Sequence, residues 1–120
     1  MTRLIALVFL LSGSAVFAED DIGTLTKPDF EDYEAMEEYR GKLYAAYSTC
    51  TFAAERRMLS LSEVDICMLT FLKLKLSFLN GVTADRYVNM TPTTRAVANR
   101  KGYDAYRAWR HRQIAGLSVD

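Results

Sequence analysis

The chain has 120 residues, and its 15 basic and 15 acidic side chains give a formal net charge of zero. A chain of this length forms one domain with one modest hydrophobic core. With one histidine and two cysteines, the composition excludes a metal centre built from a cluster of His and Cys ligands.

The first eighteen residues have the pattern of a secretory signal peptide. Arg3 precedes an apolar run, and small residues follow and end at Ala18. An uncleaved membrane anchor is the alternative, but the apolar run is shorter than the roughly 20 residues that span a bilayer. We therefore expect cleavage after Ala18 and a periplasmic or secreted protein.

The segment that would follow cleavage, residues 19–29, is acidic and has no hydrophobic period. We expect it to be a flexible acidic arm, with a single helical domain over residues 30–120. A first helix should follow Pro28, because apolar residues recur there at intervals of three and four up to Met58. Gly41 interrupts this pattern and could mark a kink or a close contact with another helix.

The most apolar stretch outside the leader is residues 60–81. Leu72 to Phe78 alternate as in a strand, but Ser60 and Glu63 have the spacing of a helix capping box, and Gly81 is typical of a helix stop. A helix is therefore favoured over a strand. Because it is apolar on nearly all sides, we expect it to be the central helix of a bundle.

The two cysteines, Cys50 and Cys67, lie on these two helices. They are equally far from the expected turn near residues 58–60, so an antiparallel hairpin would bring them face to face. In an exported chain such a pair forms a disulfide. The spacing is not that of a redox CxxC pair.

Beyond Gly81 the signals are weaker. Thr83 or Asp85 could cap a short helix, and Thr91 followed by Pro92 starts another. Gly102 either ends that helix or is tolerated within it, and Gly116 should close the last element. The sequence thus predicts an all-α fold: a small helical bundle of three to five helices, built on a disulfide-stapled antiparallel helical hairpin.

Charge is unevenly distributed along the chain. Lys27 is the only basic residue among the acidic side chains of residues 19–38, and Asp104 is the only acidic one among the basic side chains of residues 86–112. The simpler interpretation is that the acidic and basic helices lie together and offset one another. The alternative is that the basic segment meets an anionic partner.

No motif for catalysis, metal binding or a cofactor is present, so we expect neither catalytic residues nor metal ligands nor a cofactor. His111 lies among arginines, and Glu55 and Glu63 flank the expected turn without the spacing of a catalytic pair. Nucleic acid is not expected as the partner of an exported protein.

We therefore predict a noncatalytic binding protein of the bacterial envelope, an adaptor, inhibitor or chaperone whose partner is another envelope protein. Aromatic residues and arginines are typical of interface hot spots, and the candidates are Tyr103, Tyr106, Arg107, Trp109, Arg110 and Arg112. The alternative is a peripheral binder of anionic lipid or polymer through the same basic segment. An enzyme with an unrecognised motif ranks third.

Overall fold

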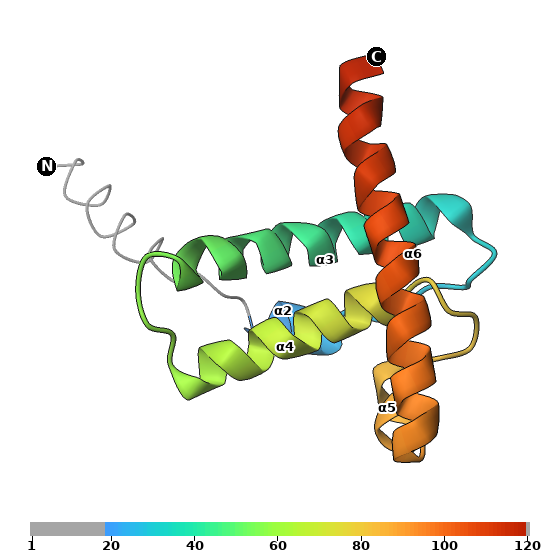
Figure 1. Ribbon diagram of the computed structural model, residues 1–120, viewed down its shortest axis with the longest axis horizontal. Helices are drawn as coiled ribbons and strands as arrows, with labels where there is room; N and C mark the ends of the chain where they lie inside the picture. The colour runs from blue at the N-terminus through green and yellow to red at the C-terminus, as the bar shows by residue number, and fades with distance from the viewer. Residues whose placement is uncertain (1–18, 120) are drawn as a thin grey trace, which may run out of the picture.

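The computed structural model describes residues 19–119, so the expected signal peptide lies outside the described residues. Within this range every regular element is a helix, which confirms the all-α prediction. The helices are α2 (Glu19–Thr24), α3 (Tyr33–Ala54), α4 (Leu61–Leu76), α5 (Ala84–Val88) and α6 (Pro92–Val119). Figure 1 shows α3 and α4 side by side as a hairpin, with α6 crossing them.

Both helices of the hairpin begin at capping residues. Asp32 accepts a hydrogen bond from the backbone N–H of Ala35 at 3.1 Å and starts α3. The predicted capping box of Ser60 and Glu63 is confirmed: each side chain accepts a hydrogen bond from the other residue's backbone N–H, at 3.2 and 2.9 Å. These bonds satisfy N–H groups that have no partner within a helix, and so fix where each helix begins.

The predicted disulfide is also confirmed. Cys50 of α3 and Cys67 of α4 are bonded, and their Cα atoms lie 5.8 Å apart. Disulfides of this structural kind persist in oxidising compartments, so the bridge indicates that the protein works outside a reducing cytosol. Among the described residues, no helix has the length and apolar character needed to cross a bilayer.

The crossing of α4 and α6 depends on a glycine. A Cβ atom on Gly102 would lie 2.6 Å from the backbone oxygen of Lys75, so only glycine allows the two helices to approach this closely. Beside it, Lys75 Nζ donates a hydrogen bond to Asn99 Oδ1 at 2.6 Å. Gly102 lies within the continuous helix α6, which confirms the second of the two expectations for this glycine.

Two other glycines differ from the sequence predictions. Gly41 is exposed on α3, and a Cβ there would have no atom within 4 Å, so the expectation of a close helix contact is wrong. Gly116 does not close the last helix, because α6 continues to Val119. Both glycines therefore lie inside continuous helices, and the glycine at position 116 does not by itself end α6.

The core joins residues from both ends of the described chain. Its buried members are Ile22, Met36, Tyr39, Leu43, Leu74, Tyr106 and Trp109. Ile22, in the segment predicted to be a flexible acidic arm, retains only 7% of its accessible surface and packs in this core. A single isoleucine among acidic residues produces no hydrophobic period, and the sequence therefore contained no signal of its burial.

Two lysines fasten this N-terminal segment to α4. Lys27 Nζ donates hydrogen bonds to the carbonyl oxygens of Leu76, Leu79 and Val82 at 2.9, 2.5 and 2.9 Å, at the C-terminal end of α4 and in the loop beyond it. In return, Lys73 Nζ donates to the carbonyls of Ile22 and Leu25 at 2.7 and 3.0 Å, at the end of α2. Lys27 thus caps the C-terminal end of α4, and Lys73 caps the C-terminal end of α2.

We call the paired contacts of Lys27 and Lys73 the lysine clasp. The burial of Lys27 in this clasp predicts a pH dependence of the stability of the protein. Burial, and secondarily the charge of Arg40, lower the pKa of Lys27 to about 8 from an ordinary value of 10.5. Between these values the unfolded chain binds more protons than the folded one, so this lysine's contribution to the free energy of unfolding rises with pH. We expect the difference between the parent and a Lys27→Met variant, measured by urea unfolding, to increase from about pH 7 to about pH 9.5.

Burial also lowers the pKa of Lys73 and of Lys75, but both proteins contain these lysines, so their contribution largely cancels in the difference. The pH range also excludes the titration of a buried tyrosine. Burial raises the pKa of Tyr39 to about 12, so its contribution to stability falls only above the ordinary tyrosine pKa of 10. A difference between parent and variant that stays constant or falls over the range would contradict the assigned pKa of Lys27. Direct titration of the Lys27 Nζ resonance by NMR would give the same pKa independently.

Candidate functional site

The aromatic residues predicted to form a binding face are divided by the fold. Tyr106 and Trp109 retain 6% and 5% of their accessible surface and belong to the core. Trp109 donates a hydrogen bond from Nε1 to Glu37 Oε1 at 3.0 Å and packs edge-on against Tyr44, while Tyr106 packs edge-on against Phe71. These two side chains therefore hold α6 against the hairpin and are not available to a partner.

A sequence signal for this burial does exist. Gly102, Tyr106 and Trp109 are spaced by four and three residues, so they share one side of α6. A glycine on the same stripe as two large aromatics is typical of a face that packs closely against another helix. Only the position of Lys75 beneath Gly102 shows that this face is internal.

The remaining candidates lie on the surface of α6. Tyr103 keeps 42% of its accessible surface, and Arg107, Arg110 and Arg112 are exposed. Arg110 Nε donates a hydrogen bond to the hydroxyl of Tyr44 at 3.3 Å, and the guanidinium of Arg107 lies 5.8 Å from the ring centre of Tyr103. Figure 1 shows that the C-terminal part of α6 projects beyond the hairpin.

These basic side chains are not neutralised within the described chain. Among residues 22–116, the ion pairs are Arg40–Glu37, Lys42–Glu38, Arg56–Glu55 and Arg57–Glu63, and none includes a residue of α6. The acidic α3 and the basic α6 do meet, but through Trp109, Tyr44 and their hydrogen bonds. The expectation that the two helices offset one another by ion pairing is therefore not met in this part of the chain.

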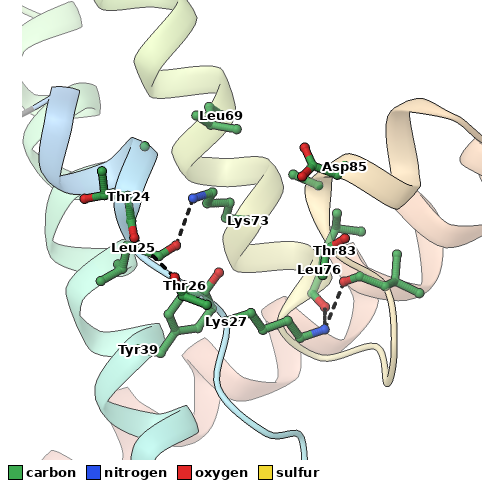
Figure 2. Close-up of a pocket in the computed structure, with 13 residues that line it drawn as sticks. Thr24, Leu25, Thr26, Lys27, Tyr39, Leu69, Lys73, Leu76, Thr83 and Asp85 are labelled. Carbon is green, nitrogen blue, oxygen red and sulfur yellow. Dashed lines mark hydrogen bonds between the residues drawn. The ribbon is translucent and has the colours of Figure 1, made fainter.

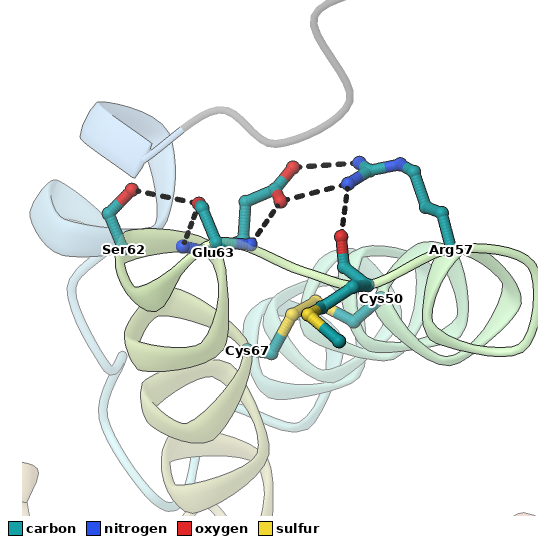
Figure 3. Close-up of polar contacts among 7 residues, drawn as sticks. Cys50, Arg57, Ser62, Glu63 and Cys67 are labelled. Atoms are coloured by element: carbon teal, nitrogen blue, oxygen red, sulfur yellow. Dashed lines mark hydrogen bonds and ion pairs between the residues drawn. A yellow bond between two sulfur atoms is a disulfide. The ribbon is translucent and has the colours of Figure 1, made fainter.

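The two carboxylates that flank the hairpin turn, Glu55 and Glu63, contact neighbouring arginines. Glu63 pairs with Arg57 at 2.7 Å, and the hydrogen bonds from Arg57 and from the backbone of Ser60 lower the pKa of Glu63 to about 2. Figure 3 shows this arrangement beside the Cys50–Cys67 bridge. Glu55 is exposed and lies 3.5 Å from Arg56. Each of the two carboxylates is therefore paired with an arginine at the turn.

A groove that sequence reasoning missed lies beside the lysine clasp, and we call it the arm groove. One wall is the segment of residues 23–27, the floor is α4, and the other wall is the segment of residues 82–85; the cavity measures about 320 Å³. Figure 2 shows Lys73 on the side of the first wall and Asp85 on the second. The only sequence signal was the isolated Lys27 within an acidic segment, and its partners could not be deduced without the fold.

Among the described residues, no group of three or more His, Cys, Asp and Glu side chains is arranged to hold a metal ion. His111 is exposed on α6. No family model, curated protein or solved structure shows significant similarity to this chain.

Proposed function

We propose that the protein is an exported, noncatalytic binding protein of the bacterial envelope that recognises an acidic surface of another protein through the exposed end of α6. The observation that carries this proposal is the set of α6 arginines without a carboxylate partner among residues 22–116. Such a positive surface accelerates association with an acidic partner and sets specificity. The Cys50–Cys67 bridge supports function in an oxidising compartment.

The exposed end also carries groups suited to an interface. Tyr103, Arg107 and Ile114 are separated by four and seven residues, which places them on one side of the helix, and Ile114 keeps 56% of its accessible surface. Tyrosine and arginine are enriched among residues that contribute most to binding. This side adjoins the buried face of Tyr106 and Trp109, and its own side chains remain exposed.

A lipid surface is the less favoured partner. A helix that binds a bilayer buries a continuous apolar face in the acyl region. In α6 the largest apolar side chains, Tyr106 and Trp109, are already buried against the hairpin, and Tyr103 and Ile114 stand apart on the exposed side. The arginines remain available, but the apolar face that insertion requires is not.

A matched pair of charge reversals tests the proposal. The oxidised protein is used to capture partners from an envelope extract, beside Arg107→Glu/Arg112→Glu and the control Lys42→Glu/Arg56→Glu. The control changes the net charge equally, at exposed positions of α3 and of the turn that follows it. We expect the α6 variant to lose at least about tenfold in affinity for the captured protein, and the control to keep it within about twofold. Arg110 is left unchanged because it contacts Tyr44.

Salt dependence and vesicles complete this test. Binding of the purified partner should weaken as ionic strength rises, because exposed charges are screened. Equal losses in the two variants would show a general effect of net charge and contradict the assigned surface. If the protein bound anionic vesicles and captured no protein from the extract, the partner would be a lipid surface, which would contradict the proposal.

A further inference from the structure

The arm groove carries opposite charges on its two walls. Lys73 contributes an ammonium group from α4, and Asp85 contributes a carboxylate from the first turn of α5. The two groups interact electrostatically but do not form an ion pair within 4 Å. Both groups therefore line one cavity without a direct ion pair between them.

Both charged groups have binding capacity left. Among residues 22–116 the acceptors for Lys73 Nζ are the carbonyls of Ile22 and Leu25, and an ammonium group has three donors. The Asp85 carboxylate forms no ion pair with any residue from 22 to 116; the hydrogen bond from Asn89 goes to the Asp85 backbone oxygen. Lys27, by contrast, uses three carbonyl acceptors and is a structural group.

The rest of the lining combines aliphatic side chains with the hydroxyl groups of threonines. Leu69 and Leu76 come from α4, and Leu25 and Val82 come from the two walls. A volume of about 320 Å³ lies at the lower end of the range for small-molecule sites, which combine apolar walls with a few charged groups. The groove therefore suits a compact ligand with an apolar body and two opposite charges.

We propose that the arm groove binds a free α-amino acid with an aliphatic side chain, its carboxylate directed to Lys73 and its ammonium to Asp85. The aliphatic side chain would contact Leu69 of the floor and the partly exposed Leu25 and Val82 of the walls. This inference is independent of the α6 surface, because the groove is formed by the N-terminal segment, α4 and α5.

The test uses leucine and two analogues that each lack one charge. Isocaproate keeps the carboxylate and loses the ammonium, whereas isopentylamine keeps the ammonium and loses the carboxylate. Binding to the oxidised, isotope-labelled protein is followed through backbone amide shifts in NMR. We expect leucine to saturate with a dissociation constant of about 1 mM or lower, with shifts at residues 23–27 and 82–85, and both analogues to bind at least about tenfold more weakly.

A variant of the second wall locates the ammonium contact. Asp85→Asn should weaken leucine and isopentylamine at least about tenfold and leave isocaproate unchanged, since only the first two carry an amine. Asp65→Asn is the control, because it removes an exposed carboxylate of α4 outside the groove. Lys73→Met would test the other contact but could release α2, so the proposal does not depend on it.

Three results would overturn the proposal. One is leucine binding that does not saturate by about 10 mM. Another is isocaproate or isopentylamine binding as tightly as leucine, which would reduce the site to a simple ion-binding surface. The third is saturable leucine binding whose amide shifts lie outside residues 23–27 and 82–85, or whose dissociation constant is the same in the Asp85→Asn variant.

Discussion

Replacing Gly102 with alanine should lower the free energy of unfolding by about 1–3 kcal/mol, the usual range for overpacking. The added Cβ would lie 2.6 Å from the oxygen and 3.0 Å from the carbon of the Lys75 carbonyl group. Both are backbone atoms in the last turn of α4, so relief requires α4 and α6 to separate. Separation would also loosen the packing of Tyr106 and Trp109 in the core.

Gly41→Ala is the matched control. It makes the same change in the middle of a helix, at an exposed position where a Cβ meets no atom within 4 Å. Alanine has the higher helix propensity, so this variant should gain about 0.5–1 kcal/mol. Urea unfolding of both variants measures the contrast. A stabilised Gly102→Ala variant would show that the two helices do not cross this closely.

Reducing the Cys50–Cys67 bridge should lower the free energy of unfolding by about 3 kcal/mol, because the closed loop restricts the unfolded chain. The two cysteines are 17 positions apart in the sequence. The measurement compares chemical unfolding of the oxidised protein with that of the same protein in reductant. This comparison keeps every side chain in place and isolates the cross-link itself.

A Cys50→Ala/Cys67→Ala variant provides the second measurement. Its loss should equal or slightly exceed that of the reduced protein, because Cys50 is buried and its sulfur contributes to packing. The variant should also be insensitive to reductant. If the oxidised and reduced proteins differed by less than about 1 kcal/mol, the bridge would contribute little beyond the helical packing that surrounds it.

Local features of the sequence determined much of the fold. Ser60 and Glu63 specified where α4 begins, because a capping box needs only residues three positions apart. Thr91 and Pro92 specified the start of α6 in the same way. The pairing of Cys50 with Cys67 followed from their equal distance to the turn. Each of these depends on short-range geometry that the chain itself encodes.

The division of α6 into an internal and an external side was decided by tertiary structure. Helical periodicity grouped Tyr103, Tyr106 and Trp109 as one aromatic face, since residues three apart are neighbours on a helix. The crossing of α4 at Gly102 buries Tyr106 and Trp109 and leaves Tyr103 at the edge. The difference depends on the angle and depth of a contact between distant segments, which periodicity does not contain.

The arm groove was likewise beyond the reach of the sequence. Lys27 binds carbonyl groups at residues 76–82, and Lys73 binds carbonyl groups at residues 22–25. Backbone carbonyls are the same at every position, so a side chain that binds them leaves no partner residue to recognise in the sequence. The sequence by itself determined the two helices of the hairpin, the capping box of α4 and the disulfide. Only the tertiary structure decided which side chains are available to a ligand or partner, because availability depends on what the rest of the chain covers.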